Sequence, residues 1–141
     1  MEFEKSCGAV LFSTSNNKIK YLILHYEEGH WDFPKGKQEL DEEEKETVLR
    51  EIQEETGIAD AEFIANFQEL TKYYYTRDKK TIHKNVSYYL AKTKTEEVTI
   101  SHEHIGYTWL SFDKALKKLT FDNAKELLKK ANKFLIENNL I

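Results

Sequence analysis

The sequence predicts an α/β layered domain built on a mixed β-sheet. Strand-like apolar stretches alternate with two segments of helical spacing, and 40% of the 141 residues are hydrophobic, with 13% aromatic. A chain of this length buries roughly 68–70% of its unfolded surface, so it can hold a core without disulfides. One proline, five glycines and no repeat or low-complexity run predict a single domain over residues 1–141.

The N-terminal part is predicted to form two strands and a loop. Residues 8–13 are mostly apolar, which is typical of a buried strand. A polar turn at 15–17 leads to a second apolar stretch at 20–26, and a glycine-containing loop follows over 27–36.

A helix is predicted over residues 43–56. Its apolar stripe is formed by Val48, Leu49 and Ile52, and Gly57 stands where the helix would end. Asp41 is the nearest residue of a favourable N-cap type, so we expect the helix to begin close to it.

The C-terminal part is predicted to contain further strands and a second helix. Residues 61–71 are strand-like, an aromatic run occupies 73–75, and strands are expected at 86–91 and 107–110. Residues 123–137 have an apolar face at helical spacing, which we expect to pack on the sheet. That face comprises Ala124, Leu127, Leu128, Ala131, Phe134 and Leu135.

Composition excludes several classes of protein. The net charge of −4 argues against a general nucleic-acid-binding surface, so no stable nucleic-acid partner is expected. No apolar run approaches the ~18 residues needed to span a bilayer, and the first residues lack a secretory pattern. Cys7 is the single cysteine and cannot form an internal disulfide. These features predict a cytoplasmic monomer with no membrane partner.

The predicted helix at 43–56 carries a face of carboxylates. Glu51, Glu54 and Glu55 stand at positions i, i+3 and i+4, which places them side by side. Like charges at this spacing destabilise a helix by ~0.2–0.5 kcal/mol per pair. A solvated charged face is the plain interpretation. The alternative is a site for Mg²⁺, or for Mn²⁺ in its place, because both ions prefer carboxylate oxygens.

The same segment resembles the Nudix family. Gly36, Glu42 and the run Arg50-Glu51-Ile52-Gln53-Glu54-Glu55-Thr56-Gly57-Ile58 match the Nudix box at every defined position. The resemblance implies a Nudix-type α/β/α sandwich. It also implies a magnesium-dependent hydrolase of a nucleoside diphosphate linked to another group.

The flanking residues resemble the asymmetrical diadenosine tetraphosphate hydrolases within that family. The matching segments are Cys7-Gly8-Ala9, Gly29-His30-Trp31, Phe33-Pro34-Lys35-Gly36, Ser101-His102-Glu103-His104 and Tyr107-Thr108-Trp109-Leu110. Bacterial RNA 5′-pyrophosphohydrolases usually have Gln-Gly where this chain has Lys35-Gly36. Phe33 departs from the second proline that the animal diadenosine enzymes tend to have.

The resemblance implies a metal site and its helpers. The implied ligands are the carboxylates of Glu51, Glu54 and Glu55 and the backbone carbonyl of Lys35. Arg50 is expected to orient a carboxylate of the site rather than touch substrate. Hard oxygen ligands would hold the metal against phosphate and lower the pKa of a bound water.

Glu103 is the candidate outside the box. It lies in a polar loop before the last predicted strand, where catalytic groups are common. The resemblance makes it a further metal ligand or the general base; the plain interpretation is an exposed glutamate. A zinc site on His102 and His104 is not favoured, because no cluster of cysteines accompanies the two histidines.

Substrate contacts are expected from five residues. Lys35 and Lys84 would bind phosphate oxygens, since each matches a lysine of the diadenosine hydrolases. Tyr75 and Phe121 would offer flat faces to a base, where stacking contributes ~1–3 kcal/mol. His30 is expected at the mouth of the pocket. Ordinary packing or solvation is the alternative for each.

The expected function is therefore metal-dependent hydrolysis of dinucleoside polyphosphates. By resemblance, diadenosine tetraphosphate would yield ATP and AMP. A metal-activated water, deprotonated by Glu103 or by a box glutamate such as Glu54, would attack phosphorus in line. The partner would be this small-molecule nucleotide. One alternative is a pyrophosphohydrolase of nucleoside triphosphates or RNA 5′ ends. Another is a non-catalytic Nudix module that senses nucleotides.

Overall fold

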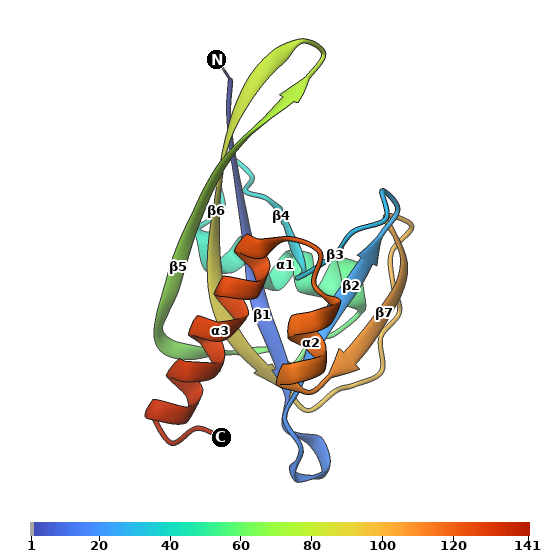
Figure 1. The fold of residues 1–141 in the computed structure, drawn as a ribbon, viewed down its shortest axis with the longest axis vertical. Helices are drawn as coiled ribbons and strands as arrows, with labels where there is room; N and C mark the ends of the chain where they lie inside the picture. Colours follow the sequence, from blue (N-terminus) through green and yellow to red (C-terminus); the bar gives the residue numbers. More distant parts are fainter. Residues whose placement is uncertain (1) are drawn as a thin grey trace.

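The computed structural model describes residues 2–141, which form a seven-stranded sheet with helices on both faces (Figure 1). The strands are β1 (Glu2–Ser13), β2 (Lys20–Tyr26), β3 (Trp31–Asp32), β4 (Lys35–Lys37), β5 (Glu62–Arg77), β6 (Lys80–Thr93) and β7 (His104–Leu110). The helices are α1 (Glu44–Thr56), α2 (Phe112–Lys118) and α3 (Asp122–Glu137), with a short 3-10 turn η1 (Ser15–Asn17).

The sheet is mixed, as predicted. Its main order is β3-β2-β1-β6-β5, while β4 pairs with β1 and β7 pairs with β2. Strand β1 runs parallel to β6 along its whole length, from the Glu2–Ile82 pair to the Ser13–Thr93 pair. All other pairings are antiparallel.

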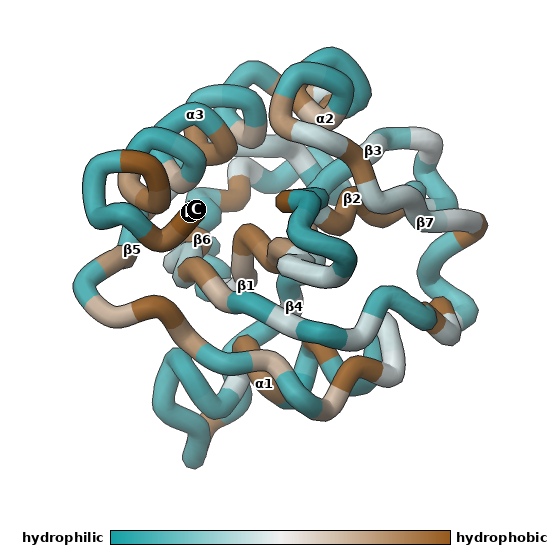
Figure 2. The backbone as a smooth tube through the Cα atoms, turned by 90° about the horizontal axis from the view of Figure 1, so that it is seen from below, coloured by the Kyte–Doolittle hydropathy of each residue, from teal (hydrophilic) through white to brown (hydrophobic). Residues whose placement is uncertain are grey.

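The two faces of the sheet carry separate cores, and this confirms the α/β/α sandwich. Alternate side chains of a strand point to opposite faces. Val10 and Phe12 of β1 accordingly pack with α2 and α3, whereas Ala9 and Leu11 pack with α1. Figure 2 shows these layers, with α1 below the sheet and α2 and α3 above it. Within residues 2–141, no helix is both long and apolar enough to cross a bilayer.

Helix α1 confirms one predicted end and corrects the other. Gly57 is left-handed, with φ of 77°, and its N–H donates to the Gln53 carbonyl, so it closes the helix as expected. The N-cap is Glu43 and not Asp41. The Glu43 N–H donates to Glu46 Oε1 at 2.9 Å, which satisfies one of the free N–H groups at the helix start.

The predicted apolar stripe is also corrected. Leu49 is 42% exposed and faces away from the core, whereas Val48 and Ile52 are buried. Thr47, Glu55 and Thr56 fill the rest of the buried face. The buried face of α1 thus includes a charged residue, Glu55, which differs from the predicted apolar stripe and is important for the site.

Several strands are longer or more numerous than predicted. Strand β1 begins at Glu2, β6 begins at Lys80, and β5 includes the aromatic run. Asp78 and Lys79 both have positive φ, which makes a two-residue hairpin turn between β5 and β6. The usual Asn-Gly signal is absent there, and residues 76–81 around the turn are polar and exposed, so apolar alternation could not reveal them.

Short elements were also missed. The loop predicted at 27–36 contains β3 and the start of β4, and α2 fills the space between β7 and α3. Each of the three has seven residues or fewer, which is too short for a periodic pattern to stand out.

Candidate active site

A cleft of about 1010 Å³ opens between the β5–β6 hairpin and the start of α3. Its lining includes most of the residues singled out from the sequence. These are His30, Lys35, Gly36, Glu55, Tyr75, Lys84, Glu103 and Phe121. Of the remaining candidates, Arg50, Glu51 and Glu54 lie on the α1 side of Gly36 and are not part of the lining.

Glu55 is a buried carboxylate at the floor of this cleft, with only 2% of its surface exposed. Its Oε1 accepts a hydrogen bond from the Lys35 backbone N–H at 3.0 Å, so the last turn of α1 is tied to β4. Its Oε2 lies 3.1 Å from His104 Nε2. Burial raises the pKa of Glu55, because the charged form loses its hydration.

Glu51 lies one turn earlier, directly over Gly36. A Cβ at residue 36 would lie 1.9–2.3 Å from the Glu51 carboxyl atoms, so only glycine allows this approach. Burial, followed by the nearby Glu55 charge, raises the pKa of Glu51 to about 7. The two carboxylates therefore form a desolvated pair of like charges.

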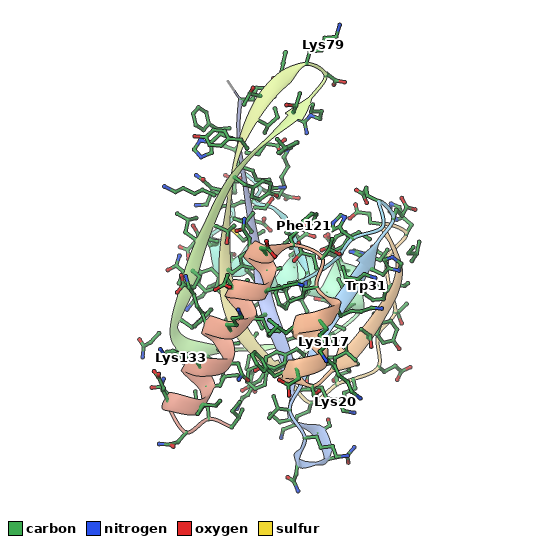
Figure 3. The ribbon with its side chains drawn as sticks, viewed as in Figure 1. Lys20, Trp31, Lys79, Lys117, Phe121 and Lys133 are labelled. Carbon is green, nitrogen blue, oxygen red and sulfur yellow. The ribbon has the colours of Figure 1, made fainter. Side chains whose placement is uncertain are left out.

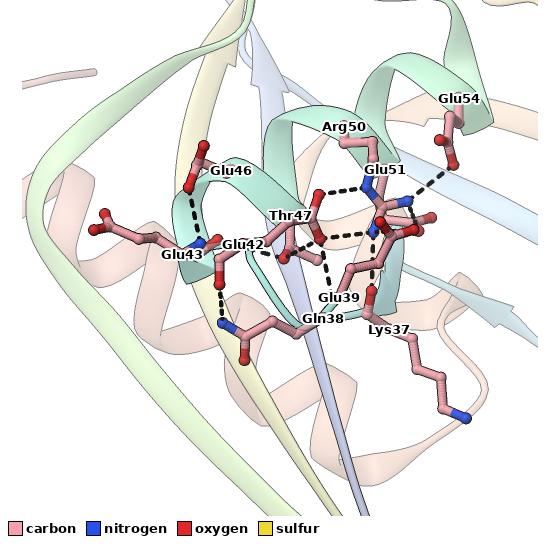
Figure 4. A network of polar contacts seen from close by, with 10 residues as sticks. All are labelled: Lys37, Gln38, Glu39, Glu42, Glu43, Glu46, Thr47, Arg50, Glu51 and Glu54. Atoms are coloured by element: carbon pink, nitrogen blue, oxygen red, sulfur yellow. Dashed lines mark hydrogen bonds and ion pairs between the residues drawn. The ribbon is translucent and has the colours of Figure 1, made fainter.

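Arg50 holds the surrounding carboxylates together (Figure 4). Its Nε donates to Glu42 Oε2 at 2.6 Å, and Nη1 donates to Glu51 Oε1 at 2.8 Å and to Glu54 Oε2 at 3.2 Å. Nη2 also donates to the Lys37 carbonyl at 2.9 Å. One guanidinium thus connects the start of the helix, its carboxylate face and β4.

Two lysines line the cleft, and one of them, Lys35, forms a buried ion pair. Lys35 Nζ lies 3.2 Å from Asp32 Oδ2, and the Asp32 side chain is only 5% exposed. The other carboxylate oxygen, Oδ1, accepts the Phe33 N–H. Lys84 lines the cleft nearby, and burial followed by the charge of Lys35 lowers its pKa. Asp32 was not predicted as a site residue, because no motif or spacing distinguishes it in the sequence.

Aromatic rings of β5 and of the segment before α3 line the cleft. Tyr73 and Tyr75 share one face of β5 with ring centroids 6.2 Å apart, and the Tyr75 hydroxyl donates to Glu4. Phe121, labelled in Figure 3, is half exposed just before α3. Its ring centroid lies 5.4 Å from that of His30. Tyr74 points to the other face, as the strand alternation requires. Glu4 was also missed, because it lies before the predicted start of β1.

Glu103 and the histidines beside it have different environments. Glu103 is exposed and lines the cleft, whereas His104, the first residue of β7, is buried. His102 is exposed. His102 and Glu103 form a turn before β7, so the two histidines lie in different surroundings.

Comparison with known proteins decides the family. The NUDIX domain model matches residues 5–131. The chain is 36% identical to an asymmetrical bis(5′-nucleosyl)-tetraphosphatase of Rattus norvegicus, covering 93% of this chain and 95% of that protein. The enzyme of the same name from Caenorhabditis elegans is 31% identical, with 93% and 96% covered. The chain belongs to the Nudix family.

A solved structure agrees with this assignment. A binary complex of the C. elegans Ap4A hydrolase has a TM-score of 0.83 to this chain at 29% identity, covering 95% of this chain and 98% of the other. This Nudix chain is thus a hydrolase close to the Ap4A hydrolases in both sequence and fold.

Nudix hydrolases generally use divalent metals, and the residues here fit such an ion. Glu51 and Glu55 are paired like charges with little hydration, so a cation would relieve their repulsion. The buried His104 Nε2 beside them has no aligned hydrogen-bond partner. In the part of the chain that is described, no three acidic, histidine or cysteine side chains already converge. Arg50 instead draws Glu51 and Glu54 toward itself.

Proposed function

We propose that this protein hydrolyses dinucleoside polyphosphates asymmetrically, converting diadenosine tetraphosphate to ATP and AMP. The observation that carries the proposal is the cleft itself. Its lining combines the buried carboxylate of Glu55, the lysines Lys35 and Lys84, and the aromatic rings of Tyr75 and Phe121. A substrate that carries bases on a chain of phosphates would find a chemical partner for each of its parts in this lining. The names of the rat and nematode relatives support the same substrate class.

The chain's own residues have distinct tasks in this proposal. Lys35 and Lys84 bind the phosphate chain, and the Asp32 ion pair holds the Lys35 ammonium in place. Tyr75 stacks on one base and Phe121, with His30 behind it, on the other. These contacts hold the substrate so that one phosphorus lies close to the Glu55 carboxylate.

A divalent ion belongs to the proposed site. Glu51, Glu54 and Glu55, with the Lys35 backbone carbonyl, would hold Mg²⁺ or, in its place, Mn²⁺. When bound, the ion would neutralise phosphate charge and lower the pKa of a water. Arg50 orients the carboxylates of Glu51 and Glu54 for this purpose.

The chemical step is hydrolysis by one water molecule. Glu103 takes a proton from the water, and the water oxygen attacks phosphorus in line with the bridging oxygen that leaves. That bridging P–O bond breaks, and its electron pair stays with the departing nucleotide. Because Glu103 is exposed in a loop, it can return its proton to solvent.

Hydrolysis in ¹⁸O-labelled water tests the proposal. Diadenosine tetraphosphate should give ATP and AMP in equal amounts, with a single ¹⁸O in one product. The comparison panel contains nucleoside triphosphates and RNA 5′ triphosphates. Rapid cleavage of RNA ends with no cleavage of dinucleotides would contradict the substrate assignment. Nucleotide binding without any product would identify a sensing module instead.

The setting of the enzyme is part of the proposal. We infer a cytoplasmic monomer in which residues 1–141 act as one domain, with a nucleotide as its partner and no stable nucleic-acid complex. The net charge of −4 and the single buried cysteine support this setting. Sedimentation of the purified protein at micromolar concentration tests the monomer.

A further inference from the structure

The buried imidazole of His104 has no task in the proposed reaction. Its side chain is fully buried between α1 and the loop that carries Glu103. The Tyr26 ring packs against it in an edge-on arrangement, with centroids 4.4 Å apart. A polar ring costs free energy in such a place unless its nitrogens find partners, so the surroundings of each nitrogen are informative.

Ser101 determines the hydrogen-bonding role of His104 Nδ1. Ser101 Oγ lies 3.0 Å from His104 Nδ1 and also accepts the Glu103 backbone N–H at 3.3 Å. With a backbone donor already on Oγ, the hydroxyl hydrogen is free to point to Nδ1. A neutral imidazole that accepts at Nδ1 carries its hydrogen on Nε2.

The Nε2 side faces Glu55. The distance from Nε2 to Glu55 Oε2 is 3.1 Å, yet the N–H is not aligned for a full hydrogen bond. Contacts of this kind are often misaligned in a ligand-free enzyme and tighten in the working complex. The other Glu55 oxygen is held by the Lys35 N–H at 3.0 Å.

We infer that His104 is a positioning residue for Glu55, with Ser101 fixing its tautomer. The chain of contacts runs from the Glu103 backbone through Ser101 and His104 to the Glu55 carboxylate. It therefore couples the loop of the proposed general base to the helix of the proposed metal ligands. The inference rests on the proposed function only in taking Glu55 as a metal ligand. Donors behind a ligand typically change metal affinity about 10–100-fold when they are removed.

Mn²⁺ binding to the protein without nucleotide tests the inference. Free Mn²⁺ is measured by electron paramagnetic resonance for the unmodified protein and for His104→Leu, His104→Gln and Ser101→Ala. We expect His104→Leu to weaken binding about 10–100-fold. His104→Gln keeps an N–H donor and should restore most of the affinity. Ser101→Ala removes one hydrogen bond and should weaken binding about 2–10-fold.

His102→Gln is the matched control, since His102 is exposed and two residues away on the same segment. It should bind Mn²⁺ as the unmodified protein does. Folding of every variant is checked by circular dichroism and thermal unfolding. Should His104→Leu fail to fold, Ser101→Ala decides, and an unchanged affinity in that variant overturns the inference.

Two further results would overturn it. One is a folded His104→Leu variant with the same Mn²⁺ affinity as the unmodified protein. The other is a nitrogen bound directly to Mn²⁺, seen as a nuclear modulation of the electron spin echo, which would make His104 a ligand. The substrate assay is separate. Weaker Mn²⁺ binding in His104→Leu, with no dinucleotide cleavage by the unmodified protein, would sustain this inference and refute the proposed function.

Discussion

Glu54 and Glu55 are neighbours in the chain with opposite surroundings. The Glu54 side chain is 58% exposed and forms an ion pair with Arg50, whereas the Glu55 side chain is 3% exposed between Lys35 and His104. Helical spacing places both beside Glu51, but it does not indicate how deeply each side chain is buried. Glu55 is buried by β4 and β7, which lie elsewhere in the sequence. The pattern therefore identifies the carboxylates but does not predict which of them is buried.

Glu54→Gln tests a proposed ligand without disturbing the fold. The exposed side chain makes one hydrogen bond, so the midpoint of thermal unfolding should change little. If Glu54 binds the metal, kcat should fall by about 100-fold or more. Glu126→Gln on α3, also exposed, is the control and should keep full activity. Unreduced turnover in Glu54→Gln would remove Glu54 from the site.

Arg50→Lys tests whether shape matters as well as charge. A lysine cannot reproduce the fork that reaches Glu42, Glu51, Glu54 and the Lys37 carbonyl. We expect a loss of about 1–3 kcal/mol in the free energy of unfolding, together with a fall in kcat. Urea titration and steady-state kinetics measure the two effects. A fully stable and fully active variant would contradict this role.

Among the contacts between elements, the contact of β4 with α1 determines where the Glu51 carboxylate lies. Three residues of β4 pair with β1, and this places Gly36 under the Glu51 carboxylate. The predicted helix, its glycine stop and the sequence of main strands could be read from periodicity. The position of β4 could not, because a strand of three residues leaves no pattern. The Nudix resemblance supplied Gly36 as a motif position, and the structure gives the physical reason for it.

Gly36→Ala tests that relation. The new methyl group would collide with the end of the flexible Glu51 side chain, so the carboxylate should move while the fold remains. We expect kcat to fall by about tenfold or more, because a misplaced catalytic group costs far more than its displacement suggests. Gly106→Ala is the control, since its added carbon would lie 3.7 Å from His25 Cβ, an ordinary contact. Equal activity in both variants would contradict the prediction.

The ion pair at the start of α1 should give the protein a pH dependence in acid. The hydrogen bond from Arg50 lowers the pKa of Glu42 to about 2. A folded-state pKa below the unfolded one stabilises the protein above the unfolded value, near 4.5, and this gain disappears as the pH falls toward 2. Glu42→Gln should therefore be less stable than the unmodified protein at pH 7 and equally stable near pH 2. Urea unfolding at several pH values measures this, and a pH-independent difference would contradict it.

At the scale of the molecule, the hydrophobic cores that stabilise the fold are distinct from the cleft in which the reaction is proposed to occur. The core under α2 and α3 contains fully buried residues such as Leu128 and Leu135, while the cleft lies at the edge of that layer. Composition and periodicity sufficed to predict an α/β layered domain and the α3 packing face, while the α/β/α arrangement came from the Nudix resemblance. They could not predict the cleft, whose walls come from the hairpin, β3 and β4 and depend on pairings between distant segments.

Leu128→Ala should lower stability without altering the site. Removing a buried leucine side chain costs about 2–5 kcal/mol, because a cavity remains. Activity per folded molecule should stay unchanged at temperatures well below unfolding. Chemical denaturation and kinetics at 15 °C measure both quantities, and a large fall in kcat at that temperature would show that the core and the cleft are coupled.

The parallel pairing of β1 with β6 has a consequence for how the molecule assembles. Each Cα pair joins residues that are 80 positions apart, such as Ser6 and Val86. Contacts of such long range slow folding, because a large loop must close before they form. During synthesis the first strand emerges long before its parallel neighbour exists. The edge of β1 that pairs with β6 therefore stays unpaired until residue 93 has left the ribosome. We expect chaperones to bind longest to nascent chains that are stalled before that point.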